Sequence, residues 1–404
     1  MDPKSCNWRR SARALCISAG VACLVVAEPV HAQDDVAPVE VHGFVSQGFI
    51  KTTANNYLAD SKRGSFEFAE VGVNFTKSFT DQLRVGLQFF ARDLGPIGNY
   101  TPQVDWFYLD YRFWDWLGLR AGRTKLPFGL YNETNDVDSA RVPILLPQSV
   151  YPTTSRDYLL AQTGGELYGR VPLGGAGALE YRMYGGTIYL DTSSSAATIP
   201  KLTVPYLIGG RLMWQTPLEG LQAGGSLQDT RLDFDYQPPA ALIALRQMEG
   251  SLSADFRGPM KVQVPALLAV GSVEYQMGDL LLAAEYSRWR VRIESPNQVL
   301  LANKDTVSER AYLMTSYRVT PWLSPGLYYS MLFMDVDHRE GREAYQHDVA
   351  ATLRFDLTDH WLLKLEGHYL HGTGALTSAQ NDNQLTRTLT KDWGLFLLKT
   401  TAYF

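Results

Sequence analysis

Arginine alternates with apolar residues in one short run, RWRVRI, at positions 288–293. In an extended strand successive side chains point to opposite faces, so the guanidinium groups of Arg288, Arg290 and Arg292 would share one face. A guanidinium is a planar donor that binds a carboxylate or phosphate through two parallel hydrogen bonds. The run therefore indicates a face suited to anions.

A second group of charges lies in a stretch of different character, Leu119 to Gln162. Prolines at 127, 143, 147 and 152 remove backbone donors there and disfavour a regular strand. An irregular segment of this length is uncommon as a simple connection and usually carries function. Its charged candidates are Lys125, Glu133, Asp136, Asp138, Arg141, Arg156 and Asp157.

The elements around these candidates read as β-strands. In QLRVGLQFFARD (82–93), leucine, valine and phenylalanine occupy one face, and Arg84, Gln88 and Arg92 occupy the other. Such a dyad is typical of a transmembrane barrel with an apolar outer face and a polar interior. A soluble β-sandwich has the same period, so alternation alone leaves both alternatives open.

The spacing of the connections favours the barrel. Sixteen strand-like runs follow Val39, and seven tight turns, near Phe79, Trp114, Leu173, Pro217, Gly278, Pro321 and Thr358, alternate with longer polar loops. Short turns at one end and long loops at the other are expected of outer-membrane barrels. We therefore expect an all-β fold, a transmembrane antiparallel up-and-down β-barrel of about sixteen strands. In it, the irregular stretch from Leu126 to Ala161 would fold inward as the third external loop and narrow the pore.

The ends and the composition indicate export. Residues 1–32 have the arginine-rich start, apolar run and Val30-His31-Ala32 cleavage site of a signal peptide, which leaves 33–404 as the barrel domain. All three cysteines, at positions 6, 16 and 23, lie in this leader. The net charge of −5 argues against nucleic-acid binding.

Three features together resemble the Gram-negative general and phosphate-selective porin superfamily: VHGFVSQGF near the start, GRTKLPFGLYNE at 122–133, and the terminal Phe404. The resemblance implies passive diffusion of small hydrophilic solutes through a water-filled channel in the bacterial outer membrane, and a homotrimer in contact with lipid and lipopolysaccharide. It also implies that Phe404 addresses the chain to the barrel-insertion machinery. Anion-specific members use an arginine ladder, so anions such as organic acids or phosphate are the expected preference.

On this interpretation the arginine run should face the lumen, because Arg near the bilayer midplane on the lipid face costs roughly 2–4 kcal/mol. The alternative is a strand end above the bilayer, where the arginines would meet lipopolysaccharide or acidic loops. The further pore-lining candidates are Arg84, Arg112, Arg123, Arg170 and Arg182. Arg123 does not fit the alternation, which turns it outward together with Leu119 and Ala121.

Enzyme chemistry is not indicated. His368 and His371 are separated by an odd number of residues and would point to opposite faces, so they cannot share a metal. A Gly-x-Ser-x-Gly nucleophile elbow does not occur in the sequence. We expect a porin without a cofactor. The alternative is a plugged-barrel surface receptor or adhesin without an open pore.

Overall fold

The computed structural model describes residues 38–95, 97–189 and 201–404, and for Asp157 and Lys201 it describes the backbone alone. These residues belong to one compact unit, Ala37–Phe404. The expected leader, residues 1–32, lies outside the described residues. So do positions 190–200, which belong to the connection between the seventh and eighth strands.

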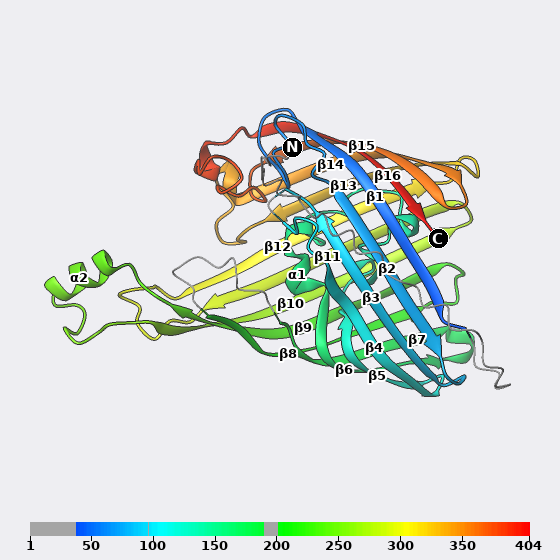
Figure 1. Ribbon diagram of the computed structural model, residues 1–404, viewed down its shortest axis with the longest axis horizontal. Helices are drawn as coiled ribbons and strands as arrows, with labels where there is room; N and C mark the ends of the chain where they lie inside the picture. The colour runs from blue at the N-terminus through cyan, green and yellow to red at the C-terminus, as the bar shows by residue number, and fades with distance from the viewer. Residues whose placement is uncertain (1–37, 96, 190–200) are drawn as a thin grey trace, which may run out of the picture. The chain divides into compact units, whose positions relative to one another are not determined.

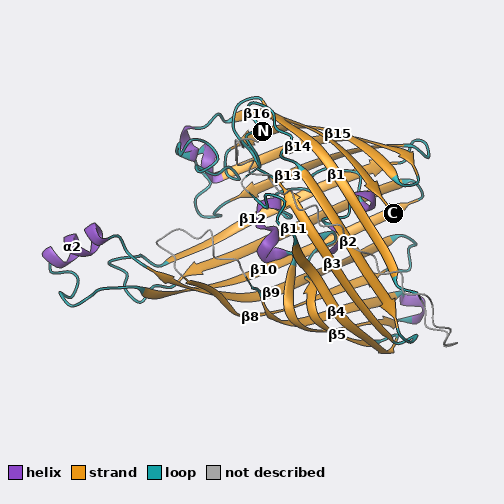
Figure 2. Cartoon of the chain, viewed as in Figure 1, coloured by secondary structure: helices purple, strands orange, loops and turns teal. Residues whose placement is uncertain are grey.

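The described residues form sixteen β-strands, two α-helices and six short 3-10 turns (Figures 1 and 2). The strands are β1 (Glu40–Thr52), β2 (Ala69–Ser78), β3 (Leu83–Asp93), β4 (Gln103–Trp114), β5 (Leu117–Lys125), β6 (Ala161–Pro172), β7 (Ala178–Thr187), β8 (Lys201–Gln215), β9 (Leu221–Tyr236), β10 (Met260–Met277), β11 (Leu280–Ile293), β12 (Lys304–Tyr317), β13 (Leu323–Phe333), β14 (Tyr345–Thr358), β15 (Trp361–Gly372) and β16 (Asp392–Tyr403). The helices are α1 (Arg156–Leu159) and α2 (Ala240–Met248). The 3-10 turns are η1 (Asn132–Thr134), η2 (Asp138–Ala140), η3 (Thr153–Ser155), η4 (Gly174–Ala176), η5 (Arg342–Ala344) and η6 (Thr386–Thr388).

The sheet is a closed up-and-down barrel. Each strand pairs antiparallel with its neighbours in the chain, and β1 pairs with β16 to close the ring, with Phe44 opposite Tyr403. The seven predicted tight turns are confirmed, at 79–82, 115–116, 173–177, 216–220, 278–279, 318–322 and 359–360. The third long connection, residues 126–160, joins β5 to β6.

Two details differ from the sequence expectation. Regular pairing extends into the irregular stretch, because β5 continues to Lys125 and β6 begins at Ala161. The long loop expected from Gln237 to about Val262 contains the helix α2, which lies at the far end of the β9–β10 hairpin (Figure 1). Leu242 and Ile243 of this helix pack against an apolar cluster that includes Met260 and Val262. This packing stabilises the short helix.

Burial separates the two faces of the sheet. On β15 the buried positions include Lys364, Glu366 and His368, while large apolar side chains such as Leu327 on β13 and Phe396 on β16 are exposed. We call the buried set the inner face and the exposed set the outer face. This order is expected of a transmembrane barrel and is the reverse of a soluble sandwich, which buries its apolar face. None of the helices that the structure describes is both long and apolar enough to cross a membrane.

Aromatic side chains mark the short-turn end of the barrel. Trp114 and Trp116 stack on each other beside the 115–116 turn, and both are exposed. Trp322 and Trp361 are exposed beside two other short turns. Tryptophan is enriched at membrane–water interfaces, so these side chains are placed as in an aromatic girdle at the short-turn end.

Candidate functional site

The 126–160 segment is held by a carboxylate on β11. Glu285 is buried on the inner face and accepts hydrogen bonds from the hydroxyl groups of Tyr151, Tyr312 (2.8 Å) and Ser272. The same carboxylate accepts the backbone N–H of Leu130 at 2.9 Å. A buried charge is costly unless its hydrogen-bonding capacity is used, and here the segment supplies two of the donors.

A second attachment lies on β15. Glu366 accepts the backbone N–H groups of Ile144 (2.6 Å) and Leu145 (2.9 Å), and the hydroxyl of Thr352 at 2.6 Å. Two residues earlier on the same face, Lys364 donates to backbone carbonyls of the segment, those of Asp138, Arg141 and Pro143, at 2.8, 2.9 and 3.4 Å. Glu366 therefore binds backbone N–H groups of the segment, and Lys364 binds its backbone carbonyl groups.

Asp138 ties the segment to β16. Its carboxylate lies 2.7 Å from Lys399 and accepts the hydroxyl of Thr401 at 2.8 Å. Burial alone would raise the pKa of Asp138, but the positive charges of Lys399, Lys364 and Arg141 outweigh burial and hold this pKa far below its usual range. The carboxylate is therefore ionised wherever the barrel is folded near neutral pH.

A compact network joins the segment to β3, β4 and β5. Arg156 contacts Asp105 at 2.9 Å and Asp136 at 3.3 Å, and Lys125 contacts Asp136 at 2.7 Å. Gln88 donates to both carboxylates, at 2.9 and 3.2 Å. Burial would raise the pKa of Asp136, but Lys125 and Arg156 outweigh it and hold the pKa well below its usual value.

Glu133 connects the segment to the strands on the other side of this network. Its carboxylate lies 3.1 Å from Arg182 on β7 and 3.6 Å from Arg211 on β8, and Arg182 also binds Glu166 at 2.5 Å. Burial would raise the pKa of Glu133, but the two arginines outweigh burial and lower it. The Glu133 side chain keeps 28% of its exposure, so it lies at the edge of the buried network.

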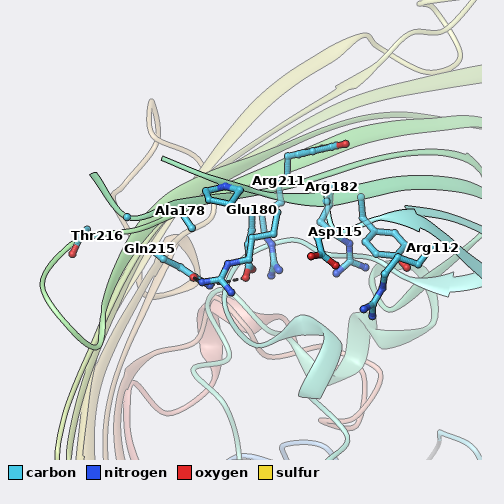
Figure 3. A pocket seen from close by; sticks show the side chains of 14 residues that line it. Arg112, Asp115, Ala178, Glu180, Arg182, Arg211, Gln215 and Thr216 are labelled. Carbon is cyan, nitrogen blue, oxygen red and sulfur yellow. Dashed lines mark hydrogen bonds between the residues drawn. The ribbon is translucent and has the colours of Figure 1, made fainter. Parts of the chain in front are cut away.

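That edge borders a cavity of about 900 Å³ on the inner side of β4, β6, β7 and β8. Figure 3 shows Arg112, Arg182 and Arg211 beside this cavity, with Asp115 and Glu180 near them. Arg170 is a further lining residue and donates to Gln215 at 2.6 Å. Four arginines and two carboxylates line one space, which is an environment for anions.

The predicted site residues fall into three groups. Lys125, Glu133, Asp136, Asp138 and Arg156 form contacts between the segment and the wall, together with Arg182. Arg141 pairs with Asp138 inside the segment. Arg84, Arg112 and Arg170 lie on the inner face, and Arg84 pairs with Asp110 at 3.3 Å. The side chain of Asp157 lies outside the described residues.

The third group requires correction. Arg288, Arg290 and Arg292 lie on the outer face of β11, opposite to the face of Glu285 and Ser287. They pair there with Glu309 (3.9 Å), Asp305 and Glu294 (3.9 Å). The prediction of a lumen ladder is therefore wrong. That prediction rested on the energetic cost of arginine on the lipid face, which applies within the bilayer. These residues lie toward the long-loop end of β11, which agrees with the alternative of a strand end above the bilayer.

Arg123 also departs from the pore-lining prediction. It lies opposite Phe107, whose side chain is exposed on the outer face, and its Nε donates to the backbone carbonyl of Asp105 at 2.7 Å. This is the outward position that alternation indicated.

Sequence reasoning missed Asp105, Glu285, Lys364 and Lys399. Lys364 carried a usable signal, since it alternates with Leu363 and Leu365 in the same way as the arginines of other strands do. His368 and His371 point to opposite faces as expected, and pair with different carboxylates, Asp348 and Asp392. Among the described residues no group of three or more His, Cys, Asp or Glu is placed to hold a metal.

Comparison with known proteins finds likeness in structure alone. No protein-family model and no curated protein sequence matches the chain. The outer-membrane-expressed OmpT of Vibrio cholerae, which is also solved in a trimer form, has 13% sequence identity and a TM-score of 0.55 over 92% of this chain and 99% of that one.

Two further solved structures are similar to the same degree. The anion-selective porin from Comamonas acidovorans has 11% identity and a TM-score of 0.54, over 91% of this chain and 99% of that one. The outer-membrane channel DcaP of Acinetobacter baumannii has 12% identity and a TM-score of 0.53, over 91% and 97%. At these identities the likeness shows the fold, a closed outer-membrane type of barrel.

Proposed function

We propose that this protein is an outer-membrane porin, which lets small hydrophilic solutes diffuse passively through the barrel without a cofactor or catalytic step. The observation that carries the proposal is the inverted order of the two faces. Charged side chains lie on the inner face of a closed sixteen-strand sheet, and apolar side chains are exposed on the outer face. A polar interior within an apolar outer band is the design of a water-filled membrane channel.

The 126–160 segment would form the constriction of this channel. It contacts Gln88 on β3, Arg182 on β7, Glu285 on β11 and Glu366 on β15. These strands are spread around the closed ring, and a segment can reach all of them at once from the inside. Solutes would then be selected by size and by the field between the basic and acidic groups beside the segment.

A preference for anions such as organic acids or phosphate follows from the cavity. Arg112 and Arg170 form no ion pair with any described residue. Four arginines and two carboxylates line the cavity, so positive charge is in excess there. An anion-selective porin has a similar fold.

The cellular setting is part of the same proposal. Residues 1–32 would direct export, residues 33–404 would form the mature barrel, and Phe404 would address it to the insertion machinery of the outer membrane. The trimer form of OmpT supports a homotrimer. The outer-face arginines of β11 would meet the phosphate groups of lipopolysaccharide, because they lie toward the long-loop end of the strand.

One observation favours a second candidate, a plugged-barrel receptor or adhesin. The segment contributes to two apolar clusters. One includes inner-face residues such as Tyr184 and Tyr312, and the other joins Ile144 to Leu58 of the first long connection and to Trp393 of β16. Apolar packing on both sides of the segment would obstruct the lumen more fully than a constriction requires. A permeability measurement separates the two candidates.

That measurement is swelling of liposomes that contain the refolded protein in isotonic sugar solutions. A porin gives swelling rates that fall as the sugar becomes larger, since the segment sets a size limit. Liposomes without protein are the control for leakage. A protein that is folded and inserted but gives no swelling with the smallest sugar would favour the plugged receptor.

A further inference from the structure

The four arginines of the cavity are used in two different ways. Arg182 and Arg211 both face Glu133, at 3.1 and 3.6 Å, and Arg211 also donates to the carbonyl of Gly129 at 3.2 Å. Arg112 and Arg170 are exposed on the inner face and form no ion pair with a described residue. The cavity therefore holds one arginine pair with a carboxylate in place and two further arginines without one.

The carboxylate in place belongs to the 126–160 segment and not to the barrel wall. Glu133 lies in η1 of the 126–160 segment, whereas Arg182 and Arg211 are fixed on paired neighbours, where Arg182 lies directly opposite Arg211. Two guanidinium groups held side by side in this way match the oxygens of a carboxylate. Glu133 thus shows the position that a carboxylate takes at this pair.

The cavity lies toward one end of the barrel. Asp115, Gly177 and Thr216, which are among its lining residues, belong to three of the short turns. Lining by turn residues places the arginine cavity between the constriction and the short-turn end. A solute approaching from that end would meet Arg112 and Arg170 as well as the pair that Glu133 occupies.

We propose that this cavity is a binding site for small organic anions with two carboxylate groups, and that Glu133 is an internal stand-in for one of those groups. The proposal rests on the porin function above and adds to it a saturable site on one side of the constriction. One group of a bound dicarboxylate binds Arg112 or Arg170, the arginines without a carboxylate partner. Its second group competes with Glu133 for Arg182 and Arg211, which loosens the attachment of the segment at η1.

The direct test is calorimetric titration of the refolded protein in detergent with succinate. The wild type should bind succinate saturably. The double variant Arg112→Gln/Arg170→Gln should weaken binding by about tenfold or more, since it removes two charge-assisted contacts. The variant Glu133→Gln should strengthen binding, because the competing carboxylate is gone, and Glu133→Ala is the second variant if the first does not fold.

The matched control is Arg292→Gln, which removes one positive charge from the outer face, where the side chain is half-exposed. Its affinity for succinate should equal that of the wild type. Absence of saturable binding, or equal affinity in the double variant and the control, would overturn the proposal. Stronger binding of inorganic phosphate than of succinate would overturn the assignment to dicarboxylates.

Sidedness gives a second readout. Succinate should reduce the single-channel current at a lower concentration from the short-turn side than from the other side. A single cysteine at Gly175, where an added Cβ meets no atom within 4 Å, marks that side for an impermeant thiol reagent, because the chain beyond position 23 contains no cysteine. Current without sided block would count against the binding site alone, while succinate binding without any current would count against the porin function alone.

Discussion

The inner faces of β14–β16 and of β4–β8 both carry charges at alternate positions, yet the two walls use them differently. On the first wall Lys364, Glu366 and Lys399 are almost completely buried, and their partners come from the 126–160 segment or from neighbouring strands. On the second wall Arg112 and Arg170 face a cavity. One wall holds the segment, and the other remains available to solutes.

Desolvation explains the difference. A charge that loses its water is stable only when hydrogen bonds and opposite charges replace that water. The backbone N–H and C=O groups of residues 138–145 provide this replacement at β15. Arg112 and Arg170 beside the cavity keep their solvent, so they need no carboxylate partner and can exchange water for a solute anion.

The largest expected effect comes from breaking the sealed wall. In Glu366→Ala the backbone N–H groups of Ile144 and Leu145 lose their acceptor, and the buried His368 loses one of its two carboxylates. We expect the free energy of unfolding to fall by about 3–5 kcal/mol, as for the loss of one partner from a buried charged pair. Chemical denaturation in detergent, followed by tryptophan fluorescence, measures this loss.

The same variant should show a larger and noisier single-channel conductance, because the segment is released from β15. Glu219→Ala is its control, since Glu219 is an exposed carboxylate in the short turn between β8 and β9. A Glu366→Ala protein as stable as the control would show that the sealed wall does not hold the segment.

An intermediate effect on conductance is expected when the pH is lowered enough to protonate Glu133, which lies between the two walls. The folded state lowers the pKa of Glu133 below its usual 4.5, so its ion pairs stabilise the segment fully above that value and are lost as the pH falls through the folded-state pKa. Conductance should therefore be constant between about pH 5 and 8 and change only in more acidic solution. Glu133→Gln should show at neutral pH the behaviour that the wild type shows in acid.

The pH measurement distinguishes Glu133 from the two other carboxylates through which the segment binds the wall. The pKa values of Asp136 and Asp138 are held far below their usual range, so both remain ionised in the same pH interval. A change of conductance between pH 5 and 8 that occurs in the wild type and is absent in Glu133→Gln would contradict the role given to the Glu133 pairs.

The smallest effect is expected on the outer face. Arg290 forms an exposed pair with Asp305, and exposed pairs contribute little to stability. Arg290→Gln should leave both the unfolding transition and the ratio of anion to cation permeability unchanged. A loss of anion preference in this variant would restore the arginine run to the lumen and overturn its outer-face assignment.

The strands and short turns could be predicted because their signal is local. Alternation placed Gln88 and Arg92 on the polar face of 82–93, and both are buried on the inner face of β3. The tight turn near Gly278 was predicted from three residues between two alternating runs, and β10 and β11 meet there. A period of two residues needs no knowledge of the rest of the chain.

The site depended on contacts that alternation does not encode. Glu366 is 222 residues from Ile144, whose backbone it binds, so no local pattern relates them. Asp105 is buried because the pairing of β3 and β4 shifts at Gln88 and Phe89, and a shift of one residue changes the face. Alternation also showed that the arginines of 288–293 share a face without showing which face it is.

The measurement that tests the central claim most directly is planar-bilayer conductance of the refolded protein in a salt gradient. The account predicts stepwise openings and a reversal potential shifted toward the anion, because the cavity leaves arginine in excess over carboxylate. Protein that is folded and inserted but carries no current would contradict the open channel. Openings with a potential shifted toward the cation would keep the channel and contradict the role of the arginine wall.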